Sequence, residues 1–250
     1  MIEVKDIYMS FGDNQVLQGI SGSFKPGLTN LIIGGSGSGK TTLLKCMIGL
    51  HKPDKGKVLY DGRDFLEMDF EERIEIRKEI GMLFQGSALF DSMTVEENIM
   101  FPLNMFTDKS LSEKRDRANF CLERVNLKDK NKLFPAELSG GMKKRVGIAR
   151  AIAMNPKYLF CDEPNSGLDP KTSIVIDELI KEITEEYNTT TIVVTHDMNS
   201  VMGIGDYIIF LYEGKKFWEG SNKEISKTDI DELNDFVFAS RFMKAAKGKL

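Results

Sequence analysis

The chain has 250 residues, of which 41% are hydrophobic and 29% charged, and this composition excludes a disordered or membrane-embedded protein. A net charge of −4 excludes a broad basic surface for a nucleic-acid polymer, and the length favours one compact domain with a subdomain. The start lacks a signal-peptide pattern and no window reaches the roughly 18 apolar residues that span a bilayer, so we expect a chain that is cytosolic or reaches a membrane through a partner.

The N-terminal part predicts a β-rich entrance. Two strand-like segments, Ile2 to Phe11 and Gln15 to Phe24, are joined by a turn-rich 12–14, and a second turn at 25–27 leads into the apolar run 28–33. Phe11 and Val16 flank the first turn and could stack on a purine base. On the strand pattern alone, core packing is the commoner role for such an aromatic.

The apolar run ends in a loop suited to phosphate. Its sequence is Gly34-Gly35-Ser36-Gly37-Ser38-Gly39-Lys40-Thr41-Thr42, and a helix-like run, 43–50, follows. The glycines let backbone N–H groups converge on an anion, Lys40 can reach the β- and γ-phosphates, and the Thr41 hydroxyl can ligate Mg²⁺. A plain glycine-rich turn does not account for strand, loop and helix together, so the sequence predicts a nucleotide site.

The middle of the chain predicts a helical subdomain at about 86–155. Before it come a hairpin strand at 56–62, a helix at 70–80 and a short strand at 81–84 that ends at Gln85. On its own, a glutamine at the end of a strand is little evidence of function. Within it, Ser110 and Glu113 form a capping-box pattern, and a buried face is predicted at Ala118, Cys121, Leu122 and Val125. The segment closes with Leu138-Ser139-Gly140-Gly141-Met142 and a helix over 143–154. Ser-Gly-Gly is usually a loop and cap, although a helix N-terminus also suits an anion.

Two further strands place polar residues at their ends. The strand 158–161 precedes Asp162 and Glu163. In a phosphate-loop protein, Asp162 suits Mg²⁺ and Glu163 can orient or deprotonate an attacking water. In a chain without such a loop, two adjacent acidic residues would more simply be a solvated turn. After a helix at 172–186, the strand 191–195 leads to His196, where sheets of this kind place ligand contacts. His51 is predicted to be a loop residue.

The C-terminal part predicts a hairpin around 207–218 and a tail over about 221–250, either a docking appendage or a solvated charged tail. Cys46, Cys121 and Cys161 lie apart in apolar surroundings, without the spacing of a metal site or redox pair. They predict core positions in a reducing compartment.

Taken together, these motifs resemble the ATP-binding subunit of ABC transporters over nearly the whole chain. The resemblance rests on 34–42, Gln85, 138–142, 160–163, 166–169 and His196, in that family's order. It implies an α/β fold of the phosphate-loop NTPase class, in which a mixed sheet core carries an N-terminal antiparallel β subdomain and an inserted helical subdomain, in one domain over 1–250. No Asn-Lys-x-Asp motif of a GTPase is present.

The resemblance implies a role for each motif, with ATP and Mg²⁺ as cofactors. Phe11 would stack on adenine beside Val16, and Thr41 and Asp162 would hold Mg²⁺. Gln85 would sense the metal and the attacking water, Glu163 would be the general base, and His196 would hold the γ-phosphate. The signature Ser139, Gly140, Gly141 and Met142 would face ATP bound to a second copy of the chain, and Asp169 would cross the same interface. A head-to-tail homodimer would then complete two sites.

Two positions depart from the commonest family pattern. Met142 stands where glutamine is usual and Gly35 where proline is frequent, and neither change removes a backbone N–H from the phosphates. With the run Gln85 to Asn98, which has Asp91 where related importers often have proline, Met142 suggests the Mla/Mkl-type ATPase of Mce-associated phospholipid transport. These residues lie next to the surface where the family docks its permease.

The resemblance therefore implies a peripheral ATPase at the cytoplasmic face of the inner membrane. Its partners would be a second copy, an integral membrane permease and, in some systems, substrate-binding and regulatory subunits. The leading cargo is phospholipid, and amino acids or lipoproteins are the alternatives. A soluble factor acting on ribosomes or DNA is disfavoured by the missing basic surface, and a non-hydrolysing adaptor is disfavoured by Lys40, Glu163 and His196.

Overall fold

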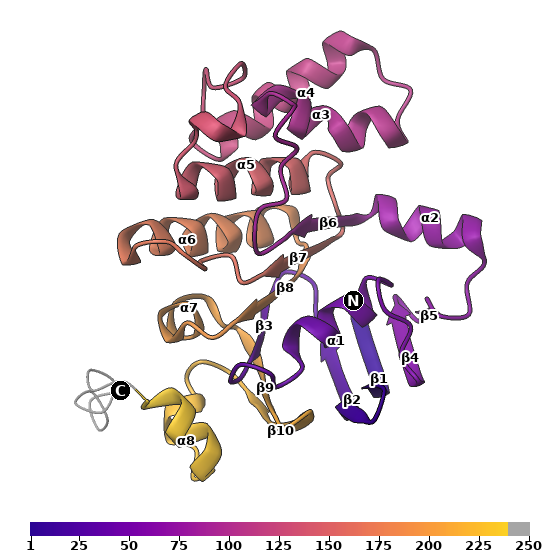
Figure 1. Cartoon of the computed structure of the whole chain (residues 1–250), viewed down its shortest axis with the longest axis vertical. Coiled ribbons are helices and arrows are strands. Elements are labelled where there is room, and N and C mark those ends of the chain that lie inside the picture. Colours follow the sequence, from indigo (N-terminus) through magenta and orange to yellow (C-terminus); the bar gives the residue numbers. More distant parts are fainter. Residues whose placement is uncertain (240–250) are drawn as a thin grey trace.

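The computed structural model describes residues 1–239, which form two sheets with helices around them (Figure 1). The six-stranded sheet has the order β10-β9-β3-β8-β7-β6, and the four-stranded sheet has the order β2-β1-β4-β5. The strands are β1 Ile2–Phe11, β2 Asn14–Phe24, β3 Thr29–Ile33, β4 Lys55–Tyr60, β5 Arg63–Asp64, β6 Ile80–Leu83, β7 Tyr158–Asp162, β8 Thr190–Thr195, β9 Tyr207–Tyr212 and β10 Lys215–Gly220. This is the predicted mixed α/β fold.

The helices follow the predicted order, with two additions towards the C-terminus. They are α1 Lys40–Met47, α2 Phe70–Lys78, α3 Val95–Phe106, α4 Leu111–Arg124, α5 Gly140–Ile152, α6 Pro170–Tyr187, α7 Met198–Ile204 and α8 Asp231–Val237, with short 3₁₀ turns at Pro135–Glu137 and Ile225–Lys227. Among the described residues, none of these helices combines the length and the apolar character needed to span a membrane.

The central strands are buried on both sides because helices or a second sheet cover each face. Every residue of β3, β7 and β8 is buried, and β3 pairs in parallel with both β8 and β9. Leu31 and Ile33 face a cluster with α5 and α6, whereas Ile32 faces a cluster with α1 and the four-stranded sheet. Continuous apolar strands of this kind are typical of parallel sheets with both faces covered.

The helices α3, α4 and α5 come between β6 and β7 in the chain, and α3 and α4 lie at the top of Figure 1, above α5. Ser110 caps α4 and forms the predicted capping box with Glu113. The predicted apolar face of this helix is also confirmed, because Ala118, Cys121 and Leu122 are fully or almost fully buried.

The segment after β10 differs from the expectation of a solvated tail. Within 221–239, Ile225, Leu233 and Val237 are buried and belong to the same hydrophobic cluster as α5 and α6. The apolar spacing in 225–237 outweighs its many charges, so for these residues the prediction was wrong. The remainder of the predicted tail, 240–250, lies outside the described residues. The three cysteines are buried and unpaired, as expected for core positions.

Candidate nucleotide site

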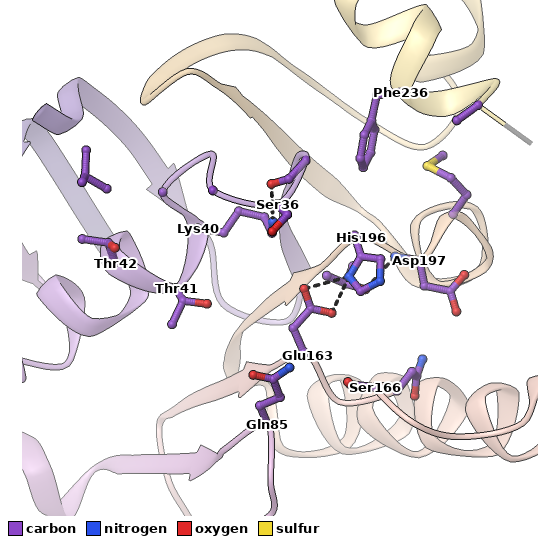
Figure 2. A pocket seen from close by; sticks show the side chains of 18 of the residues that line it. Ser36, Lys40, Thr41, Thr42, Gln85, Glu163, Ser166, His196, Asp197 and Phe236 are labelled. Carbon is purple, nitrogen blue, oxygen red and sulfur yellow. Dashed lines mark hydrogen bonds and ion pairs between the residues drawn. The ribbon is translucent and has the colours of Figure 1, made fainter. Parts of the chain in front are cut away.

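A pocket of about 1330 Å³ lies beside the phosphate loop (Figure 2). It sits at the carboxyl ends of β3, β7 and β8, the edge where parallel sheets place ligands. Of the predicted residues, the following line it: Phe11, Val16, Gly35, Ser36, Gly37, Gly39, Lys40, Thr41, Thr42, Gln85, Glu163 and His196. Gly34, Ser38 and Asp162 are buried next to the pocket and do not line it.

The loop has a conformation that requires glycine. Gly34 has φ +149°, and a Cβ on it would lie 2.2 Å from the carbonyl oxygen of Leu211. Gly39 precedes α1 with φ 99°, in the left-handed region that favours glycine. The Lys40 ammonium donates to the carbonyl oxygens of Gly34 and Gly35 at 2.9 Å each, so it lies folded against its own loop. Burial lowers the pKa of Lys40, while Glu163 and Asp162 act in the opposite direction.

Thr41 and Asp162 meet across the sheet edge. The Thr41 hydroxyl donates to Oδ1 of Asp162 at 3.1 Å. Burial raises the pKa of Asp162, the hydrogen bond from Thr41 lowers it and the charge of Glu163 raises it further. A hydroxyl and a carboxylate are hard oxygen ligands of the type that Mg²⁺ prefers, so this pair fits the metal that the sequence suggests.

Glu163 and His196 point toward one another (Figure 2). Nδ1 of His196 lies 2.9 Å from Oε1 and 2.8 Å from Oε2 of Glu163. Glu163 has φ 48°, a conformation that is uncommon for non-glycine residues and is found more often at functional sites. Its backbone N–H donates to the carbonyl of Val194 at 2.9 Å, which fixes the strand end against β8. The Gln85 side chain reaches towards the same carboxylate from the end of β6 (Figure 2).

Several lining residues were not predicted from the sequence. Asn14, Asn165, Ser166 and Phe236 line the pocket, and Phe236 enters it from α8 (Figure 2). The aromatic ring of Phe236 packs 5.4 Å from that of Phe210. The apolar spacing around Phe236 could have indicated a helix, but nothing in the local sequence relates it to a loop about 200 residues earlier. His51, predicted to lie in a loop, packs its ring edge-on at 5.5 Å from Phe11.

The signature segment lies apart from this pocket. Ser139, Gly140, Gly141, Met142 and Asp169 do not line it. Ser139 caps α5 and its hydroxyl accepts from the Met142 N–H at 3.3 Å. Asp169 caps α6 in the same manner, accepting from the N–H of Thr172 at 3.0 Å. The structure therefore does not unite the signature with the phosphate loop of the same chain.

Comparison with known proteins identifies the family. A family profile described as ABC transporter matches residues 17–166. A probable ribonucleotide transport ATP-binding protein mkl of Mycobacterium leprae is 37% identical, covering 96% of this chain and 69% of that protein. The intermembrane phospholipid transport system ATP-binding protein MlaF of Haemophilus influenzae is 39% identical, with 95% and 90% covered. The methionine import ATP-binding protein MetN of Clostridium tetani is 42% identical, with 95% and 74% covered.

A solved structure agrees with this chain in fold. It is a dimeric ATP-binding cassette in a post-hydrolysis state bound to ADP and Pi, with a TM-score of 0.81, 35% identity, and coverage of 89% of this chain and 99% of that one. The predicted likeness to ABC ATPases of Mla/Mkl type is thus confirmed, while the relatives differ in cargo. The chain belongs to the ABC transporter family and is an ATPase.

Proposed function

We propose that two copies of the chain bind two ATP molecules between them and drive phospholipid transport through a separate membrane permease. The dimer is supported by one observation: within one chain, the signature residues do not line the pocket beside the phosphate loop. The N–H groups and partial positive charge at the start of α5 are suited to a γ-phosphate. In a head-to-tail pair, the signature of each copy would meet the ATP of the other, with Asp169 at the interface.

The pocket residues divide the chemistry of hydrolysis. Lys40 turns from its own loop carbonyls to the β- and γ-phosphates, and Phe11 stacks on adenine beside Val16. Glu163 accepts the proton of the attacking water and His196 binds the γ-phosphate.

Thr41, Asp162 and Gln85 would hold Mg²⁺, which would neutralise phosphate charge when bound. Among residues 1–239, no group of three or more His, Cys, Asp or Glu side chains could hold a metal ion.

Exposed apolar side chains in and next to the helical subdomain support a membrane partner. Phe84, Phe90, Met105 and Phe106 are exposed, and the rings of Phe90 and Phe101 pack at 4.6 Å. Exposed apolar patches mark interaction sites, and Phe90, Met105 and Phe106 lie in the helical subdomain. We infer that the permease binds through these residues and propose that the chain works at the cytoplasmic face of the inner membrane.

The phospholipid cargo rests on the MlaF relative, most of whose length is matched, and on Asp91 and Met142. The MetN relative keeps methionine as the second candidate.

Co-purification tests the cargo. Tagged chain carrying Glu163→Gln is purified from membranes in mild detergent with ATP, and the bound proteins and lipids are identified by mass spectrometry. We expect a permease with phospholipid. A methionine permease without lipid would reassign the cargo and leave the ATPase chemistry intact, and the absence of any membrane partner would contradict the transport function.

A further inference from the structure

Lys144 is a buried lysine that contacts the backbone of two pocket residues. It lies on α5, and only 5% of its surface is exposed. Its ammonium donates to the carbonyl oxygen of Gln85 and, at 3.2 Å, to that of Glu163. A buried charge is retained only when it is well hydrogen-bonded, and here both acceptors belong to residues whose side chains face the nucleotide pocket.

The two hydrogen bonds from Lys144 hold the main chain of Gln85 and Glu163, and the direction of the main chain determines where each side chain points. Glu163 has a left-handed φ of 48°, and its N–H is already held by Val194 on β8. Lys144 holds the carbonyl at the other end of the same residue. For Gln85, the bond from Lys144 fixes the peptide that follows its side chain. Both residues are thereby fixed to α5, the helix that begins with the signature.

The charge of Lys144 also bears on the site. Burial lowers the pKa of this ammonium, and Cys161, Asp162 and Glu163 raise it.

A second cation on α5 contacts the segment after β6 but not Glu163. Arg150 donates to the carbonyl oxygens of Ser87 and Ala88 at 2.7 Å each. Arg150 and Lys144 together fix the segment after β6 to α5 at two points. Lys144 alone among them also reaches Glu163.

We propose that Lys144 is a positioning residue for hydrolysis, which holds the Gln85 and Glu163 side chains in register with each other and with the signature helix. This rests on the roles proposed above for Gln85 and Glu163. Lys144 touches neither ATP nor the attacking water, and acts through the main chain of residues that do.

The test compares Lys144→Met with Arg145→Met in the full chain. Arg145 is a matched control, because on the same helix it donates to the carbonyls of Val125 and Asn126 at 3.4 and 3.1 Å, away from the pocket. For Lys144→Met we expect kcat to fall about 10- to 100-fold, the effect of slightly misplaced catalytic groups, with KM for ATP changed by less than about threefold. Lys144→Arg, which keeps a cation and donors, should recover most of kcat.

Parallel measurements separate the outcomes. If Lys144→Met and Arg145→Met lower the melting temperature by similar amounts and have similar kcat values, the lysine is only structural and the proposal is overturned. Should Lys144→Met not fold, Lys144→Gln, which retains one amide group, replaces it under the same comparison. Glu163→Gln is assayed alongside: normal turnover in that variant would refute the role of Glu163 itself, independently of Lys144.

Discussion

Asp177 is a buried carboxyl that links the loop after Glu163 to the helix after His196. The side-chain amide of Asn165 donates to Oδ1 of Asp177 at 2.9 Å and to the hydroxyl of Ser200 at 3.0 Å. All three side chains are buried, and they come from the loop after β7, from α6 and from α7. Burial raises the pKa of Asp177 to about 6, with further increases from Asp197 and Glu178, while its bonds to Ser200 and Asn165 lower it.

This raised pKa predicts a stability that decreases with pH. The folded chain binds a proton at Asp177 more tightly than the unfolded chain does. Protonation of Asp177 therefore stabilises the fold fully at a pH below the pKa of Asp177 in the unfolded chain, and this stabilisation is lost as pH rises through about 6. Between about pH 4 and pH 7, we expect the unfolding free energy of the natural chain to fall by about 2 to 3 kcal/mol relative to Asp177→Asn. Urea unfolding of both proteins across this range measures the difference. Parallel pH profiles would show that Asp177 titrates normally.

At the level of elements, α5 packs against β6 at unusually short range. A Cβ on Gly81 would lie 2.4 Å from the carbonyl oxygen of Ala151, and one on Gly147 would lie 2.7 Å from Leu83. The first neighbour is backbone, which cannot rotate away. Glycines at these positions therefore set the distance between the signature helix and the strand that ends at Gln85.

Gly81→Ala tests this contact. We expect a loss of about 1 to 3 kcal/mol from overpacking, measured as a lower midpoint in urea. Gly203→Ala is the control, since a Cβ there meets no atom within 4 Å and alanine is favoured in helices by up to about 1 kcal/mol. Equal stability of the two variants would mean that α5 can shift freely on β6.

The sequence predicted elements better than contacts between them. The strand that leads to His196 and the capping box of α4 follow from local patterns, and both are present. The phosphate loop was recognised because its glycines and Lys40 are consecutive. Lys144 could not be assigned, because its acceptors are main-chain carbonyls, which leave no trace in residue type.

For similar reasons, no local pattern in the sequence predicts that Phe236 lies in the pocket. Its position depends on how α8 packs against the hydrophobic cluster that contains Phe210, which is decided by long-range burial rather than by local pattern. The buried contacts of Asn165 were missed likewise, because asparagine in a turn-rich segment predicts only a turn.

For the whole molecule, subunit mixing tests whether the signature acts across a dimer. Lys40→Ala disables the phosphate loop, and Gly140→Asp places a carboxylate at the start of α5, where it suits the helix but repels a phosphate of the partner's ATP. Each variant alone should be inactive. Mixed dimers hold one intact site, so an equal mixture should regain about a quarter of natural ATPase turnover, since about half of random dimers are mixed.

The control for this experiment is a mixture of Lys40→Ala with Glu163→Gln. Both changes affect the site of their own chain, so every site in a mixed dimer stays defective and no activity should return. Recovery in this control, or none with Gly140→Asp, would contradict a shared site.

The central place of β3 has a consequence for biosynthesis. β3 lies between β8 and β9, and every one of its residues is buried in the folded chain. A ribosome releases β3 long before either flanking strand, so the nascent chain carries an apolar strand with two open edges until β8 emerges, a state prone to aggregation. ATP cannot relieve it early, because Asp162, Glu163 and His196 are also synthesised late. We therefore expect the soluble yield to depend on chaperone capacity during translation, and co-expression of chaperones that bind nascent chains should raise it.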